Sequence, residues 1–159
     1  MPDVEELTEG PPHELAMENA HRKAIAVARL RPQALVLGVD TVVALGARVY
    51  GKPADRRQAA ATLRALAGRR HAVISGVCLV RDGVPRTAAA TTAVQFRSFG
   101  EETVAWYLDS GEWRERAGGY AIQGRGAALV AAIDGDYLNV VGLPVPLLLD
   151  LSPALLPST

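Results

Sequence analysis

One aspartate interrupts a stretch of sequence that is otherwise apolar. Asp40, followed by Thr41, divides the run from Ala34 to Leu45. Burying an unpaired carboxylate is costly, so this side chain must lie at a strand end, in a cleft or beside a cation. In a cleft, it could act as a general base or as a metal ligand. The alternative is a strand-end carboxylate that accepts a hydrogen bond from a neighbouring backbone group.

Two lysines could supply cations for such a carboxylate or for a phosphate group. Lys52 lies between Gly51 and Pro53, which fix the local backbone and present the lysine from a shaped loop. It could contact a phosphate, although a solvated lysine in a surface loop is the commoner case. Lys23 lies beside the apolar stripe of an expected helix. Its aliphatic stem could simply cover apolar surface while the ammonium group reaches water.

A glycine-rich stretch carries a single amide side chain. Residues 118–126 hold four glycines in nine positions, with Gln123 among them. Glycines let a backbone approach a ligand closely, and an amide can recognise the edge of a base. The stretch is not a dinucleotide-binding fingerprint, because Leu129 occupies the position of the third glycine. The alternative is a bulged turn between strands.

Composition and the other reactive residues exclude several classes of protein. The 159 residues are 49% hydrophobic and 21% charged, which is typical of one folded domain spanning residues 1–159. Acidic and basic residues number 17 each, which argues against a nucleic-acid-binding protein. The single cysteine, Cys78, excludes an intrachain disulfide and is expected in the core. The histidines lack metal-ligand spacing and are expected to be polar surface or helix residues; they are His13, His21 and His71.

The ends and apolar runs of the chain indicate no membrane association. The first residues are acidic, unlike the basic start of a signal peptide. The apolar runs are too short to cross a bilayer. We therefore expect a cytoplasmic protein.

Hydrophobic periodicity predicts the elements that must position these residues. Apolar residues at spacings of three and four predict a helix from Pro12 to just before Pro32. Short strands are expected on either side of Asp40 and Thr41. Further expected elements are a helix capped by Asp55 and ending at Leu66, a hairpin of strands 71–80 and 84–96 around Asp82-Gly83, a helix to Asp109 with a capping box of Ser98 and Glu101, and a strand over 127–133. This mixture indicates an α/β fold with a mixed sheet.

Five short motifs occur in a fixed order along the chain. They are Gly38-Val39-Asp40-Thr41-Val42-Val43, Gly51-Lys52-Pro53, Leu63-Arg64-Ala65-Leu66-Ala67-Gly68, Ala121-Ile122-Gln123-Gly124-Arg125-Gly126 and Val140-Val141-Gly142-Leu143-Pro144. In this order and at this spacing they resemble the Maf family of nucleoside triphosphate pyrophosphatases, over nearly the whole chain to about Leu149. The resemblance implies a Maf/ITPase-like α/β fold. Its elongated mixed sheet is flanked by helices and forms two lobes with a central cleft, often in a homodimer.

The resemblance also implies an activity and the residues that perform it. The family hydrolyses nucleoside triphosphates to the monophosphate and pyrophosphate with a divalent cation, Mg²⁺ or Mn²⁺. Asp40 matches the catalytic aspartate of the family, and Lys23 and Lys52 match two lysines that face the phosphates. Glu5 or Glu6 falls in the acidic motif that supplies a metal-associated glutamate. Together with Asp40, that glutamate would hold the metal.

Substrate choice within the family is implied by one further pair of residues. Thr41 and Gln123 match the pair typical of the branch that acts on dTTP and UTP. The same pair disfavours an inosine-triphosphate type of pyrophosphatase. A different reading is a catalytically impaired, nucleotide-binding relative that acts in cell division or septum formation.

That alternative rests on a departure from the family pattern. Family members begin with a strand, a loop reading Ser-x-Ser-Pro-Arg-Arg and a helix, and that loop contributes a serine and an arginine to the triphosphate site. This sequence starts downstream, at the acidic motif, so the first strand and helix are expected to be missing. Either Met1 is a misplaced start or the chain is a truncated relative. Such a loss would expose a sheet edge and apolar surface, so lower stability than that of N-terminally extended relatives is expected.

Overall fold

A five-stranded sheet forms the frame of the molecule. The computed structural model describes residues 2–157, and the strand order of its sheet is β2-β1-β3-β4-β5. The strands are β1 (Val36–Leu45), β2 (Arg48–Tyr50), β3 (Arg70–Arg81), β4 (Val84–Phe96) and β5 (Val130–Asp134). The helices are α1 (Pro12–Leu30), α2 (Arg56–Leu66), α3 (Glu101–Asp109), α4 (Tyr137–Val141) and α5 (Val145–Leu151). The α/β class is confirmed.

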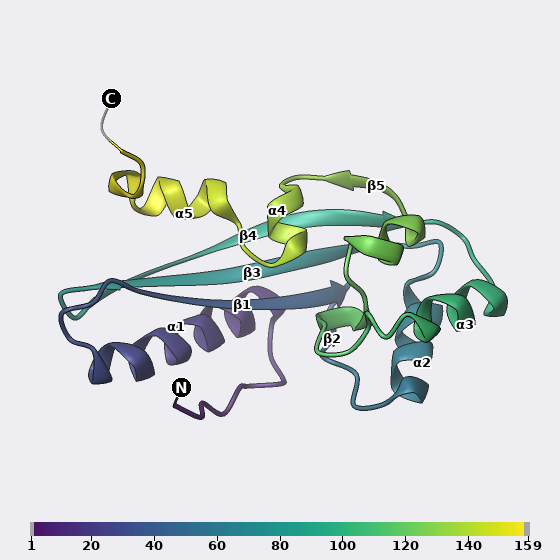
Figure 1. Cartoon of the computed structure of the whole chain (residues 1–159), viewed down its shortest axis with the longest axis horizontal. Helices are drawn as coiled ribbons and strands as arrows, with labels where there is room; N and C mark the ends of the chain where they lie inside the picture. Colours follow the sequence, from purple (N-terminus) through teal and green to yellow (C-terminus); the bar gives the residue numbers. More distant parts are fainter. Residues whose placement is uncertain (1, 158–159) are drawn as a thin grey trace.

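The helices divide between the two faces and one end of the sheet. Figure 1 shows α1 along one face, α4 and α5 over the other, and α2 and α3 together at one end of the strands. All four pairings of the described strands are antiparallel, so the sheet is not mixed as predicted. The reason is the place of α2. A parallel pair needs a crossover that runs back along the sheet, whereas α2 stays at one end, and β3 begins beside the end of β1.

Strand β1 continues through the two polar residues that were expected to interrupt it. In the β1–β3 register, Asp40 lies opposite Gly76, and Thr41 lies opposite Ser75. Side chains alternate between the faces of a strand. Asp40 therefore faces α1, and Thr41 faces the side of α4. The break predicted at this point is wrong, because an alternating strand accepts a polar side chain wherever a partner on the neighbouring layer meets it.

Helix α1 agrees with the prediction and packs directly on β1 and β3. Its small residues Ala16, Ala20 and Ala24 are fully buried. They lie over two glycines of the sheet. A Cβ atom built on Gly76 would overlap the Ala16 carbonyl group, and one built on Gly38 would overlap that of Ala20. The missing side chains thus allow the helix backbone to approach close enough for its polar residues to reach β1.

We expect Gly76→Ala to lower the free energy of unfolding by about 2–3 kcal/mol, because the added methyl group must push the α1 backbone away from the sheet. Urea unfolding followed by circular dichroism measures the change. Gly51→Ala is the matched control, since nothing lies within 4 Å of a Cβ atom added there. A Gly76→Ala midpoint equal to that of the parent chain would contradict the close helix–sheet contact.

The other elements follow the sequence signals with two differences. Asp55 caps α2 by accepting a hydrogen bond from the Gln58 amide at 2.7 Å, and the hairpin turn has positive φ at Asp82 and Gly83, as a two-residue turn requires. The capping box predicted for α3 does not form. Gly100 is the N-cap instead of Ser98, and two nitrogens of the Arg64 guanidinium hold the Glu101 carboxylate away from the helix start. Strand β5 starts at Val130 because residues 124–129 form a 3-10 helical turn, η2 (Gly124–Leu129).

The apolar residues form clusters on both sides of the sheet. The larger cluster lies between the sheet, α2 and α3, and includes Leu63, Phe96 and Tyr107. Cys78 lies in the core beneath α1, as predicted. Within residues 2–157, no helix combines the length and the apolar character needed to cross a bilayer.

Candidate active site

A cavity of about 230 Å³ brings together five of the predicted site residues. Its walls include the exposed loop between β2 and α2, the middle of β1, residues 115–123 and the end of α4. The predicted residues that line it are Lys23, Asp40, Thr41, Lys52 and Gln123. Their positions in the sequence are far apart, and the fold places them around one space.

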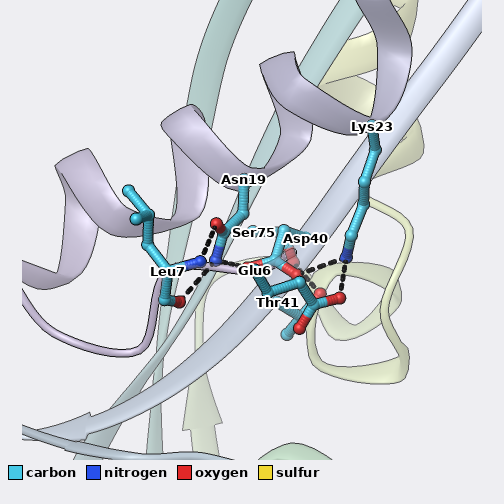
Figure 2. Close-up of polar contacts among 7 residues, drawn as sticks. All are labelled: Glu6, Leu7, Asn19, Lys23, Asp40, Thr41 and Ser75. Carbon is cyan, nitrogen blue, oxygen red and sulfur yellow. Dashed lines mark hydrogen bonds and ion pairs between the residues drawn. The ribbon is translucent and has the colours of Figure 1, made fainter. Parts of the chain in front are cut away.

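An ion-pair triad stands on the α1 side of this cavity (Figure 2). The Lys23 ammonium nitrogen lies 2.6 Å from a carboxylate oxygen of Glu6 and 2.6 Å from Oδ1 of Asp40. The Asp40 side chain is only 9% exposed, whereas that of Lys23 is 29% exposed. The lysine therefore compensates a nearly buried carboxylate and reaches solvent at the same time. Glu6 joins the triad, whereas Glu5 is exposed and forms no ion pair with any of residues 2–157.

The triad favours the charged forms of Lys23 and Glu6. Burial alone would lower the pKa of Lys23, but the hydrogen bonds to Asp40 and Glu6 outweigh burial and raise the pKa above its usual value. The hydrogen bond from Lys23 lowers the pKa of Glu6, against a smaller opposing effect of burial, and the nearby charge of Lys52 lowers it further. At neutral pH, an ammonium group is thus fixed beside a carboxylate at the cavity wall.

Asn19 is a site residue that the sequence reasoning missed. Its amide nitrogen donates to Oδ2 of Asp40 at 3.2 Å and to the Leu7 carbonyl at 2.9 Å, while its oxygen accepts from the Leu7 amide at 2.8 Å (Figure 2). Asn19 thereby orients Asp40 and ties down the segment that carries Glu6. The sequence feature that could have identified Asn19 is its position four residues before Lys23, because residues at this spacing share one face of a helix.

Thr41 belongs to a polar network on the opposite face of β1. Its hydroxyl lies 2.8 Å from that of Ser75 (Figure 2), and Ser75 donates to the Asn139 carbonyl at 3.4 Å. Asn139 is fully buried, and its amide nitrogen donates to the Val73 carbonyl and to the Thr92 hydroxyl. This network anchors α4 against the sheet, and so fixes the cavity wall that continues from it.

Two further cations face the cavity from loops that are clamped together. The Gly118 amide donates to the Gly51 carbonyl at 3.1 Å, which joins the loop of Lys52 to that of Arg116. Arg116 lines the cavity and is exposed, and Glu115 before it has a left-handed φ of 57°. Among residues 2–157, neither Lys52 nor Arg116 forms an ion pair. Arg116 was not predicted, although it lies only two residues before the glycine-rich stretch.

His71 is buried below the cavity, so its prediction as a polar surface residue is wrong. It is 3% exposed, and its Nε2 lies 2.8 Å from the hydroxyl of Tyr120, a residue that lines the cavity. The ring of His71 also packs edge-on against Phe96. The histidine lies on β3, where alternation turns its side chain into the core.

This burial predicts a pH dependence of stability. Burial lowers the pKa of His71 to about 4, from 6.5 in the absence of the fold. Between these values the unfolded chain binds a proton that the folded chain does not, so the free energy of unfolding falls as the pH decreases from 6.5 to about 4. The slope reaches about 1.4 kcal/mol per pH unit. Urea unfolding between pH 7.5 and 4.5 should show this slope for the parent and a shallower one for His71→Phe. Parallel curves would contradict it.

The carboxylates suit a metal ion only in part. Within residues 2–157, no three His, Cys, Asp or Glu side chains gather to hold a metal by themselves. Glu6 and Asp40 do converge on one point, the Lys23 ammonium group. Mg²⁺ is commonly held by one or two carboxylates together with substrate phosphates and water. These two carboxylates could therefore form only the protein's share of such a site, and the remaining ligands would have to be oxygens of a bound molecule and water.

Comparison with known proteins agrees with this architecture. The family model described as "Maf-like protein" matches residues 1–154. A Symbiobacterium thermophilum protein named dTTP/UTP pyrophosphatase is 47% identical over 147 residues, which are 91% of this chain and 76% of that protein. Proteins with the same name from Deinococcus radiodurans and Pyrococcus furiosus are 43% and 39% identical, over 94% and 92% of this chain and 76% and 77% of their own lengths. The chain is a member of the Maf-like protein family.

Proposed function

We propose that this protein is a nucleoside triphosphate pyrophosphatase that hydrolyses dTTP and UTP between the α and β phosphates. The products are the nucleoside monophosphate and pyrophosphate. Relatives that are 39–47% identical carry the name dTTP/UTP pyrophosphatase. The observation that carries the proposal is the nearly buried Asp40 at the wall of a cavity, 2.6 Å from Lys23, with the cations Lys52 and Arg116 lining the same cavity.

Asp40 is the group proposed to orient the attacking water and accept its proton. Lys23 holds Oδ1 and Asn19 holds Oδ2, so the carboxylate is fixed before the substrate arrives. A group that is positioned in advance loses little freedom in the transition state. Because only 9% of the Asp40 side chain is exposed, few waters compete for it.

Lys52 and Arg116 are the groups proposed to bind the triphosphate. Neither has an ion-pair partner within the described chain, so each can contact phosphate oxygens without first breaking a salt bridge. Phosphoryl transfer depends mainly on such positioning and charge stabilisation. Lys23 lines the same cavity, but its ammonium group is already paired with Glu6 and Asp40, so its proposed part is to hold the Asp40 carboxylate in place.

Gln123 and Thr41 are proposed to bind the pyrimidine base. Both line the cavity. The amide of Gln123 can donate and accept hydrogen bonds, as the edges of thymine and uracil require. The Thr41 hydroxyl is shared with Ser75, which limits its orientation and so its choice of partner.

A divalent cation, Mg²⁺ or Mn²⁺, completes the proposal. Glu6 and Asp40 would hold it together with phosphate oxygens. When bound, it would neutralise negative charge on the triphosphate and make the pyrophosphate a better leaving group. The cytoplasm, where nucleoside triphosphates are made, is the compartment that this proposal predicts, and the homodimer implied by the family resemblance stays a prediction.

Pyrophosphate release tests the proposal. The protein is incubated with Mg²⁺ or Mn²⁺ and with dTTP, UTP, CTP, ITP or 7-methyl-GTP in parallel. Turnover of dTTP and UTP well above that of the other three supports it, and equal rates on all five contradict the proposed base recognition. Binding without turnover of any nucleotide would favour the catalytically impaired, nucleotide-binding relative.

A further inference from the structure

The residue before the turn η2 does not cap it. Gln123 is the N-cap of Gly124–Leu129, yet its side chain forms no capping hydrogen bond. At most helix starts, the N-cap side chain accepts from the backbone amides two or three positions further on. Here, Glu112 does so from another segment. Its Oε1 accepts from the Arg125 amide at 2.9 Å, and its Oε2 accepts from the Gly126 amide at 3.1 Å.

Because Glu112 caps η2, the side-chain amide of Gln123 is free to face the cavity. Gln123 lines the cavity, whereas Glu112 does not. Gly124 makes the arrangement possible, because its φ of 63° turns the backbone under the carboxylate and a Cβ atom there would overlap Glu112. Had Gln123 capped the turn itself, its side chain would face the backbone of residues 125 and 126 instead of the cavity.

Glu112 is itself held firmly. Its own amide donates to the Ser110 hydroxyl at 3.1 Å. The next residue, Trp113, is 6% exposed, and its ring nitrogen donates to a carbonyl of α3 at 3.1 Å. Glu112 binds the segment 121–126 near its end. At the start of that segment, the Tyr107 hydroxyl accepts a hydrogen bond from the Ala121 amide at 3.0 Å. Helix α3 and the turn after it therefore hold residues 121–126 at both ends.

We propose that Glu112 is a positioning residue for base recognition, because it caps η2 in place of Gln123 and leaves the Gln123 amide free to bind the base. The inference rests on the proposed function, in which Gln123 contacts the pyrimidine. Both carboxylate oxygens of Glu112 are used in charge-assisted hydrogen bonds to backbone amides. Without them, the Gln123 side chain becomes the nearest acceptor for those amides, and it would leave the cavity.

A double-mutant cycle tests this role. The variants are Glu112→Ala, Gln123→Ala and the double variant, and the readout is the ratio of kcat/KM for UTP to that for ITP. Each single variant should lower this ratio by about 10–100-fold, as expected for a misplaced recognition group. The double variant should lose no more than either single variant, because both changes remove one function. Glu112→Gln keeps one acceptor oxygen, so its UTP to ITP ratio should lie between those of the parent and Glu112→Ala.

Two controls distinguish a role in positioning Gln123 from a general effect on the stability of the protein. Glu102→Ala removes an exposed glutamate of α3 and should leave the ratio unchanged. Inhibition by inorganic tripolyphosphate should be the same for Glu112→Ala and the parent, because the phosphate contacts come from other residues. If Glu112→Ala does not fold, Glu112→Gln, which has the same volume, carries the test.

An unchanged UTP to ITP ratio in Glu112→Ala would overturn the proposal, as would fully additive losses in the double variant. Failure of the proposed function shows itself separately, as a parent protein that hydrolyses no nucleotide. In that case, the affinity for UMP is measured by calorimetry on the same four proteins. Non-additive losses of affinity then support the role of Glu112, and additive losses or none overturn it.

Discussion

Asp40→Asn lowers kcat for dTTP by about 10²–10⁴-fold, the usual contribution of a positioned general base. Asparagine has nearly the same shape, and its oxygen can still accept a hydrogen bond from Lys23. It cannot take up a proton from water. We therefore expect the loss in kcat, with KM changed far less. The free energy of unfolding should fall by only about 1 kcal/mol, the value of one buried hydrogen bond. Pyrophosphate release and urea unfolding measure the two effects.

The matched control for Asp40→Asn is Asp109→Asn. Asp109 also pairs with a cation, Arg56, at 2.6 Å, but its side chain is 66% exposed and it lies outside the cavity. Its substitution should leave turnover and stability almost unchanged. An Asp40→Asn protein that keeps turnover within about threefold of the parent would refute the role given to this carboxylate.

Lys23→Met should damage both catalysis and folding. The variant removes the cation shared by Glu6 and Asp40 and leaves the Asp40 carboxylate, only 9% exposed, with Asn19 as its remaining side-chain donor among residues 2–157. Breaking a buried ion pair costs about 3–5 kcal/mol. Because Lys23 itself is 29% exposed, solvent screening reduces our expectation to about 1–3 kcal/mol. Turnover should fall by about 10²–10³-fold, because the Asp40 carboxylate loses the ammonium group that holds it in position.

Lys52→Met separates two roles that a cavity lysine can have, namely nucleotide binding and stabilisation of the fold. Lys52 lines the same cavity but has no ion-pair partner within residues 2–157. Its loss should weaken turnover or nucleotide affinity while leaving the urea midpoint in place. Equal destabilisation by Lys23→Met and Lys52→Met would show that the triad with Glu6 and Asp40 contributes nothing specific to folding.

The sequence predicts the elements best where local chemistry decides them. Pro12 and Pro32 bracket α1, Asp55 caps α2, and Asp82-Gly83 forms the hairpin turn, as expected from each residue alone. Local signals fail where a distant group competes. Ser98 and Glu101 match a capping box, yet Arg64 takes the Glu101 carboxylate from 37 residues away.

The candidate site shows the same division. Motif matches predict Asp40, Lys23 and Gln123 as site residues, but they do not predict which groups hold these side chains. Asn19 and Glu112 act through contacts set by the close packing of α1 on the sheet and by the fold of the segment after α3. The spacing of Asn19 and Lys23 indicates a shared helix face, but the contacts with Asp40 and with η2 form only once the layers have assembled.

The spread of the cavity wall along the chain also affects the order of events during synthesis. Strands β3 and β4 follow each other directly and can pair at a low entropic cost of loop closure. The cavity needs partners that are far apart, since its lining runs from Lys23 to Gly142, and Asn139 reaches back 66 residues to the Val73 carbonyl. A chain emerging from the ribosome therefore has a hairpin before it has a complete cavity, and the proposed nucleotide hydrolysis would report the end of folding rather than its beginning.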